Sequence, residues 1–260
     1  MDEFGLINMN ARIYDPALGM FISVDPLAQE YYNTYPYAYC GGDPMNAVDP
    51  TGELIIFING FYNGTQGAKP RYWETQSGKF DEAIMKHFKD DNKLYYDGSF
   101  GGIFGISSNI IMKNRFDMGY TVGLKEASDI IANLARDKDG YITESIKVVS
   151  HSMGGAYAKG FLTALMVYIY KYPQLSNGIS IAEYDFAPFQ SSLQKTVNGV
   201  DTYQYSHISD KIAGNDPIKG ANIMETSDTK KHSLVDFYEY INNLPQGRYK
   251  IENGKIIKIE

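Results

Sequence analysis

The sequence predicts an α/β protein in which a mostly parallel, doubly wound sheet carries helices on both faces. Two observations support this prediction. From Leu54 to about Leu244, short apolar segments rich in β-branched residues alternate with longer segments of helical spacing. The length of 260 residues is also enough to bury one sizeable core. An alternation of this kind joins neighbouring strands by helical crossovers, which makes the strands parallel and places helices on both faces.

The elements follow in order. "LIIFING" (54–60) is an apolar strand that ends at Asn-Gly, and "FDEAIMKHFKD" (80–90) has helical spacing. The later predicted strands are 93–99, 145–150, 178–188 and 202–209, and the later predicted helices are 124–138, 155–172 and 232–244. The helix at 155–172 stops before Pro173, and its apolar run at 161–170 is too short to span a bilayer, so we expect a buried helix. The last segment, 249–260, contains an Asn-Gly hairpin turn and is predicted to be peripheral.

Composition and charge exclude several classes of function. The net charge is −7 and no block of Lys or Arg occurs, which argues against nucleic acid as a partner. Cys40 is the single cysteine, so neither an intrachain disulfide nor a cysteine-based zinc site is possible. "ARDKDGYITESI" is similar to a calcium loop, but Ala135 and Ile146 occupy its first and twelfth ligand positions. We therefore expect no metal and no organic cofactor. The opening residues 1–10 lack the features of a secretory signal.

Ser152 is the candidate nucleophile. It lies in "SHSMG" (150–154), at the predicted carboxyl end of a buried strand and directly before a helix, where open α/β sheets place their active sites. Small residues at Ser150 and Gly154 permit the sharp strand-to-helix turn that exposes a serine hydroxyl. The alternative is an ordinary capping serine. The following Gly155 and the long helix favour the nucleophile.

A nucleophilic serine needs an imidazole base and a carboxylate that orients it. Of the four histidines, His87 lies in an earlier helix and His151 is expected to point away from the hydroxyl of its neighbour. His232 follows a polar loop at the start of the last predicted helix and is the predicted base. His207, in or at the end of a strand, is the alternative base. We expect instead that it pairs with a residue of the site and helps to orient it.

Asp210 is the predicted acid, because it directly follows the strand at 202–206 and precedes His232 by 22 positions. Asp185, which ends the preceding strand, is the alternative acid, and Asp216 is a further candidate that also fits a turn before proline. The oxyanion hole is expected to use the backbone N–H groups of Met153 and Phe61. The glycines beside Phe61 would let the backbone approach a substrate, or they shape only a surface loop.

Residues 54–244 resemble lipase-like α/β-hydrolases, through "SHSMG" and through "IIFINGF" at the place of their oxyanion strand. The resemblance implies an α/β-hydrolase fold and hydrolysis of an ester, most readily of a lipid. Two departures are Ser150 in place of a glycine and Asn59 where lipases often have histidine. The glycine-rich, apolar segment 98–120 is either a lid over the serine or ordinary connecting structure.

Residues 11–52 are dense in tyrosine, Asp-Pro and glycine, which predicts turns joined by short strands. They resemble the end of the core domain of RHS-repeat (YD-repeat) proteins. The matching residues are Arg12, Tyr14, Asp15, Pro16, Gly19, Phe21, Asp25, Pro26, Asn33, Tyr35, Tyr37, Pro44, Asp49, Pro50 and Gly52. The predicted domains are an RHS-core remnant at 1–53 and a hydrolase at 54–260.

The RHS resemblance implies a bacterial protein whose C-terminal part is an exported effector, often a toxin. Such proteins are sometimes cleaved near the last D-P-x-G by their own aspartates, here Asp25 and Asp49. Met20 replaces the usual arginine and Ala28 the usual glycine, and both aspartates also fit plain turns before proline. Partners would be a lipid or other ester, a membrane surface and an immunity protein.

Three functions are therefore expected from the sequence, in this order. The first is a serine hydrolase of a carboxylic ester, most readily a lipid, acting as the effector of an RHS protein. The second is an α/β-hydrolase that acts on peptide or thioester bonds. The third is a catalytically idle binding or structural module.

Overall fold

The structure is a computed structural model that describes residues 7–8, 13–15, 18, 20–23, 53–62, 68–99, 108–136, 140–213, 216–224, 232–246, 248–252 and 255–259. The chain divides into two compact units, Met1–Pro50 and Thr51–Glu260. In the first unit, β1 (Ile7–Asn8), β2 (Ile13–Asp15) and β3 (Met20–Phe21) form an antiparallel sheet. Asp15 Oδ1 accepts a hydrogen bond from the Leu18 amide at 3.2 Å in the turn after β2.

The second unit contains a six-stranded sheet in the order β11-β10-β9-β8-β4-β7, and all five neighbouring pairs are parallel. Its strands are β4 (Glu53–Ile58), β7 (Lys93–Tyr96), β8 (Ser145–His151), β9 (Ser180–Phe186), β10 (Asp201–Tyr205) and β11 (Asn222–Met224). The predicted α/β class with a mostly parallel sheet is confirmed.

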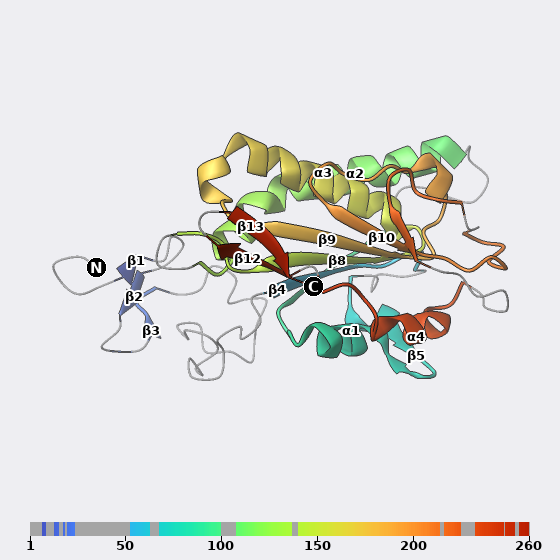
Figure 1. The fold of residues 1–260 in the computed structure, drawn as a ribbon, viewed down its shortest axis with the longest axis horizontal. Coiled ribbons are helices and arrows are strands. Elements are labelled where there is room, and N and C mark those ends of the chain that lie inside the picture. Colours follow the sequence, from blue (N-terminus) through green and yellow to red (C-terminus); the bar gives the residue numbers. More distant parts are fainter. Residues whose placement is uncertain are drawn as a thin grey trace. The chain divides into compact units, whose positions relative to one another are not determined.

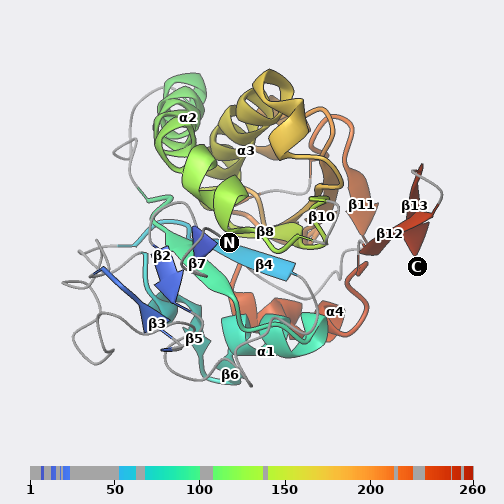
Figure 2. The same ribbon diagram turned by 90° about the vertical axis from the view of Figure 1, so that its left-hand side faces the viewer.

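Helices cover both faces of this sheet, as predicted (Figures 1 and 2). On one face lie α2 (Ser108–Asn133) and α3 (Gly154–Lys171), and on the other lie α1 (Phe80–Phe88) and α4 (Tyr238–Ile241). Each face of the sheet carries one hydrophobic core, and the residues of β4 alternate between them. Ile56 and Ile58 pack under α2 and α3, and Ile55 and Phe57 pack on the α1 side. A strand buried on both faces is apolar throughout, which explains the continuous apolar run that the sequence shows there.

Glycines bring α2 and α3 into close contact. Gly119 and Gly123 lie one turn apart on α2, and Gly160 faces them from α3. A Cβ atom at Gly160 would overlap the carbonyl of Phe116, and one at Gly123 would lie 2.7 Å from the carbonyl oxygen of Phe161. Neither helix has room for a side chain at these positions, so the two backbones pack directly on each other.

Replacing Gly160 by alanine should therefore destabilise the protein. Alanine favours a helix by about 1 kcal/mol over glycine, but the overlap with α2 forces the helices apart, and overpacking of this kind costs about 1–3 kcal/mol. We expect Gly160→Ala to lower the free energy of unfolding in urea, and Lys125→Ala on the exposed face of α2 to change it by less than about 0.5 kcal/mol. A Gly160→Ala protein as stable as the unmodified one would contradict this packing.

Two predicted helices have different bounds in the structure. The helix expected at 124–138 begins at Ser108 and ends at Asn133, so the segment 98–120, expected as a lid or as connecting structure, is helical from Ser108 onward. Of the glycines in that segment, Gly119 lies in α2, where it packs against α3. The helix expected at 232–244 is a 3₁₀ turn, η5 (Leu234–Phe237), followed by the single-turn α4, and His232 precedes both. Apolar residues of 232–244 are buried against the sheet at intervals of three or four, as in an amphipathic helix, but the segment is not one continuous helix.

The sequence prediction also missed short elements. These are the parallel edge strand β11, the 3₁₀ turns η2 (Pro70–Trp73), η3 (Pro173–Leu175) and η4 (Ser191–Leu193), and the ribbon of β5 (Glu74–Thr75) and β6 (Gly78–Lys79). The C-terminal hairpin is confirmed: β12 (Arg248–Glu252) pairs antiparallel with β13 (Lys255–Ile259). Within the part of the chain that the structure describes, no helix has the length and apolarity to cross a membrane.

Candidate active site

Ser152 occupies a constrained turn between β8 and α3. Its φ is +55°, in the left-handed region that residues with a side chain rarely adopt. The Ser152 amide donates to the carbonyl of Phe186 at 2.9 Å, and the Ser152 carbonyl accepts from the amide of Phe189 at 3.0 Å. The end of β9 and the residues after it therefore hold this turn from both sides.

The end of β4 passes so close to this turn that only glycine fits on both sides. A Cβ atom at Gly154 would lie 2.6 Å from the Asn59 carbonyl oxygen, and one at Gly60 would lie 2.7 Å from the Ser152 Cβ. The backbone that leads into Phe61 thus runs directly beside the serine. A small residue at Gly154 was expected for the turn, and the glycines beside Phe61 were expected to let the backbone approach a substrate; the structure adds that Gly60 also lies against the turn of Ser152.

Ser152, His232 and Asp210 form one hydrogen-bonded series. His232 Nε2 lies 2.8 Å from Ser152 Oγ, and His232 Nδ1 lies 2.8 Å from Asp210 Oδ2. A carboxylate oxygen accepts, so Nδ1 carries the proton and Nε2 offers its lone pair to the serine hydroxyl. The three residues come from the loops after β8 and β10 and from the segment before η5. They meet at the carboxyl edge of the sheet, where the sequence predicted them.

Asp210 is itself held in place by the backbone. Its Oδ1 accepts hydrogen bonds from the amides of Ile212 at 2.8 Å and Ala213 at 3.0 Å, and the residue is buried. One oxygen is fixed by the loop while the other meets the imidazole. This arrangement keeps the carboxylate in one orientation, as an orienting group for a histidine requires.

The alternative acid, Asp185, lies in a different cluster. It accepts hydrogen bonds from Ser150 Oγ and from Lys159 Nζ, the latter at 2.5 Å, and Lys159 also pairs with Glu183 at 2.7 Å. All three charged side chains are buried behind the turn. Burial and then the charge of Asp185 raise the pKa of Glu183 to about 7, although Lys159 opposes the shift. The Asp185 carboxylate therefore supports the interior of the sheet and the first turns of α3.

The other candidate residues are placed as follows. His207 is buried and stacks on Phe237, with ring centroids 4.2 Å apart. His87 Nε2 lies 2.9 Å from the carbonyl oxygen of Leu244, and the carbonyl of Asp216 accepts from Gln204 Nε2 at 2.8 Å. Met153 is the N-cap of α3, and Phe61 follows Gly60 with its side chain half exposed.

Asp25 and Asp49, the possible self-cleavage residues, lie outside the described residues.

Asn59, which departs from the lipase pattern, joins the ends of two strands. It is fully buried, and its Nδ2 donates to Asp97 Oδ1 at 3.0 Å and to the Gly60 carbonyl at 2.7 Å. Its Oδ1 accepts from the Gly98 amide at 3.3 Å. The side chain thus fixes the loop after β4 to the loop after β7, which is a structural use for this position.

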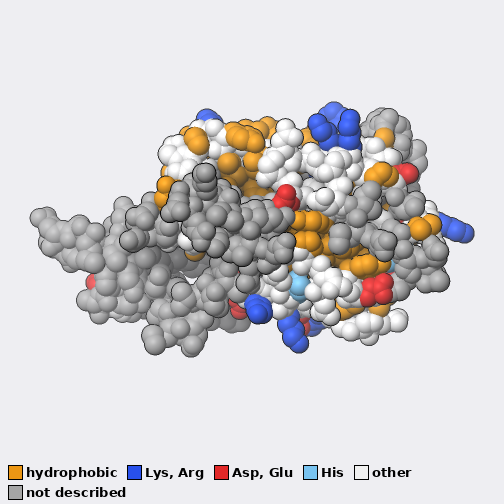
Figure 3. Space-filling model, in the orientation of Figure 1, with side chains coloured by type: hydrophobic (Ala, Val, Ile, Leu, Met, Phe, Trp, Pro, Cys, Tyr) orange, Lys and Arg blue, Asp and Glu red, His pale blue; other side chains and the backbone are white. Residues whose placement is uncertain are grey.

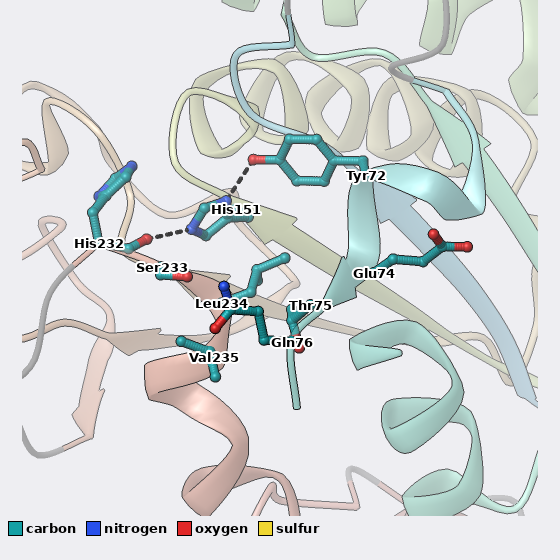
Figure 4. A pocket seen from close by; sticks show the side chains of 9 residues that line it. All are labelled: Tyr72, Glu74, Thr75, Gln76, His151, His232, Ser233, Leu234 and Val235. Atoms are coloured by element: carbon teal, nitrogen blue, oxygen red, sulfur yellow. Dashed lines mark hydrogen bonds between the residues drawn. The ribbon is translucent and has the colours of Figure 1, made fainter. Parts of the chain in front are cut away.

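Sequence reasoning missed the contacts of His151. Its Nδ1 lies 2.6 Å from Tyr72 Oη, and its Nε2 lies 2.9 Å from the backbone carbonyl oxygen of His232 (Figure 4). A carbonyl only accepts, so Nε2 carries the proton and the Tyr72 hydroxyl donates to Nδ1. The expectation that His151 points away from the serine hydroxyl gave it no role, and nothing in the sequence near Tyr72 indicated this contact.

A cavity of ≈ 840 Å³ lies beside His151 and His232 (Figure 4). Its lining residues are Tyr72, Glu74, Thr75, Gln76, His151, His232, Ser233, Leu234 and Val235.

A second hollow of ≈ 350 Å³ is lined by residues of α2, α3 and 195–198. Apolar side chains are also spread over the outer surface of the α2 and α3 layer (Figure 3). Among the described residues, no three His, Cys, Asp or Glu side chains gather as metal ligands would.

The fold and the site together define a parallel α/β protein in which a serine, a histidine and an aspartate are joined by hydrogen bonds at the carboxyl edge of the sheet. No protein-family model matches the chain. Part of the chain is similar to Salivary gland surface protein 1 of Aedes aegypti, with 33% identity over 122 residues. The match covers 39% of this chain and spans about 4% of the length of that protein. The name of this relative describes no chemistry, so the geometry of the site carries the functional argument.

The buried His151 makes a testable contribution to acid sensitivity. Burial, and then the charge of a protonated His232, lower the pKa of His151 from 6.5 to about 3. Between these values the unfolded chain binds a proton that the folded protein does not, so stability falls as the pH decreases. The slope from this group approaches about 1.4 kcal/mol per pH unit.

We expect His151→Gln to reduce the pH dependence of the unfolding free energy by up to one proton in urea titrations between about pH 4 and pH 6. The comparison is between slopes, so a uniform loss of stability in the variant does not affect it. Parallel curves for the two proteins would show that His151 is protonated in the folded state.

Proposed function

We propose that the protein is a serine hydrolase with an α/β-hydrolase fold that cleaves a carboxylic ester. One observation carries the proposal: Ser152 Oγ, the His232 ring and the Asp210 carboxylate are joined by hydrogen bonds of 2.8 Å. The parallel sheet and the position of the serine at its carboxyl edge support the same fold.

In the proposed reaction, His232 Nε2 takes the proton of Ser152 as Oγ attacks the ester carbonyl. The carbonyl electron pair moves to oxygen, and the resulting oxyanion accepts hydrogen bonds from the amides of Met153 and Phe61. The position of Met153 at the N-terminus of α3 and the closeness of Gly60 to the serine support these two donors. The imidazolium then gives its proton to the leaving alkoxide, and an acyl-serine remains.

Water completes the proposed cycle. His232 removes a proton from a water molecule, the hydroxide oxygen attacks the acyl carbonyl, and the Ser152 oxygen leaves with the proton that His232 returns. Asp210 stays ionised throughout and stabilises the imidazolium at Nδ1. The two amides that hold its other oxygen support this orienting role.

An apolar, lipid-like ester is the substrate class that we favour. Large apolar side chains are exposed in loops that follow the sheet strands on the side of Ser152: Phe61 after β4, and Ile208 and Ile212 after β10. Exposed apolar residues at the rim of a site favour contact with an apolar substrate or a membrane surface. A peptide or thioester substrate and a catalytically idle module are the alternatives, which a panel of substrates separates.

The test of the proposed function is covalent labelling with a fluorophosphonate probe, together with hydrolysis of p-nitrophenyl esters. We expect Ser152→Ala to abolish both without lowering the melting temperature, because alanine accepts the same backbone conformation. Asp210→Asn should lower kcat by about 10⁴-fold, because an amide stabilises the wrong imidazole tautomer.

The matched control is Ser191→Ala. Ser191 is also buried, and its hydroxyl has no hydrogen-bond partner among the described residues, so labelling should persist. Labelling of Ser152→Ala equal to that of the unmodified protein would overturn the proposed nucleophile.

We further propose that this hydrolase is the C-terminal effector of an RHS protein, exported by a bacterium. The support is the series of Asp-Pro, Tyr and Gly matches in residues 11–52, which ends at Asp49-Pro50-Thr51-Gly52 directly before β4. Self-cleavage involving Asp25 or Asp49, and neutralisation by an immunity protein, follow from the same resemblance. The membrane of a target cell would supply the ester.

This second proposal predicts toxicity that depends on the serine. The full chain, expressed in a susceptible bacterium and directed to the compartment outside its inner membrane, should slow growth, and Ser152→Ala should not. Equal toxicity of both proteins would indicate a mechanism without catalysis. Normal growth with an active enzyme would instead indicate a hydrolase that is not a toxin.

A further inference from the structure

We propose that Tyr72 and His151 are positioning residues that hold the backbone of His232 and the loop before Phe61 in one arrangement. The inference rests on the proposed function, because the group that it positions is the proposed base. We name the series of contacts from Gly60 through Tyr72 and His151 to His232 the positioning bridge; the two contacts of His151 are hydrogen bonds, and Gly60 packs against the Tyr72 hydroxyl.

Each hydrogen bond of the positioning bridge has a defined direction. The Tyr72 hydroxyl donates to His151 Nδ1 at 2.6 Å and packs against Gly60, where a Cβ atom would lie 2.7 Å from Tyr72 Oη. His151 Nε2–H then donates to the His232 carbonyl at 2.9 Å. Because Tyr72 donates to Nδ1, it fixes the tautomer of His151 that can donate at Nε2.

The environment of Tyr72 and His151 preserves these states. Burial raises the pKa of Tyr72 well above its usual range, so its hydroxyl keeps the proton. The titratable groups that face His151 are Tyr72, His232 and Asp210, and burial lowers the pKa of His151 enough to keep it neutral at ordinary pH. The bridge is therefore intact over the pH range in which an imidazole base works.

His232 needs such support because of where it lies in the chain. The 3₁₀ turn η5 begins only at Leu234, so the backbone of His232 is outside regular secondary structure. The cavity of ≈ 840 Å³ borders the same segment, so close packing does not fix it on that side. Figure 4 shows the His232 carbonyl directed at His151 across one wall of this cavity. Asp210 and Ser152 orient the ring of His232, and His151 fixes its backbone.

The positioning bridge also joins the two halves of the proposed machinery. One end holds Gly60, whose neighbour Phe61 supplies a proposed oxyanion donor, and the other end holds the proposed base. A displacement of about 1 Å in such a group lowers turnover by about 100-fold. Loss of the bridge should therefore lower kcat and leave KM nearly unchanged.

Two substitutions of His151 separate its two nitrogens. The amide nitrogen of His151→Gln reaches the place of Nε2 and can donate to the His232 carbonyl. The side chain of His151→Asn ends near the place of Nδ1, so it can accept from Tyr72 but cannot reach His232. If the bond to His232 matters, glutamine rescues activity and asparagine does not.

The experiment measures kcat, KM and melting temperature with an ester that the unmodified protein hydrolyses. We expect His151→Asn to lower kcat by about 100-fold, His151→Gln by less than about 10-fold, and Tyr72→Phe by about 10-fold, each with KM within about 2-fold. The double variant Tyr72→Phe/His151→Asn should lose no more than His151→Asn alone, because both act through one bridge.

The control is Tyr95→Phe. It removes a hydroxyl that donates to Asp81 Oδ2 at 2.6 Å outside the bridge, and kcat should not change. If Tyr72→Phe and His151→Asn both fold and keep the kcat of the unmodified protein, the positioning role is refuted, while the proposed function is not affected. If both His151 variants fail to fold, Tyr72→Phe decides the question. An unmodified protein that neither hydrolyses esters nor reacts with the fluorophosphonate would overturn the proposed function instead.

Discussion

The backbone at Ser152 is the constraint on which the rest of the site depends. A φ of +55° at a residue with a side chain costs of order 1–3 kcal/mol, so the surroundings must enforce it. Three glycines from three different segments meet there: Gly60 after β4, Gly98 after β7 and Gly154 after β8. A Cβ atom at Gly98 would lie 2.8 Å from the Cα of Gly154. The strand ends come together closely enough that the serine has one available conformation.

Much of this arrangement could be predicted from the sequence, because it follows from local patterns. The apolar run of β4 and the strand-to-helix change around Ser152 are readable in a few neighbouring residues. Asp210 and His232 could be chosen because polar residues that follow parallel strands gather at one edge of the sheet. Position after a strand also fitted Asp185, and in the structure it is Asp210 that contacts His232.

Other parts of the site depend on contacts between distant residues, and no local pattern shows them. Tyr72 and His151 are 79 positions apart, and their hydrogen bond exists only because η2 packs beside the end of β8. Asp185 fitted an acid by its position at the end of β9, but the buried Lys159 pairs with it from α3. Gly119 belongs to the glycine-rich segment 98–120, which was expected to be a lid or connecting structure, and glycine disfavours isolated helices. The cost is offset by packing against α3, which the sequence of α2 alone does not contain.

The glycine contact between α2 and α3 has a mechanical consequence. Two helices whose backbones touch along Gly119, Gly123 and Gly160 cannot slide or separate without losing contact along several turns, so α2 and α3 are expected to move together. The opposite layer is built from the nine-residue α1 and the four-residue α4, with the large cavity beside it. Motions that admit a ligand to the serine are therefore expected on the α1 and α4 side, where the cavity lies, more than between α2 and α3.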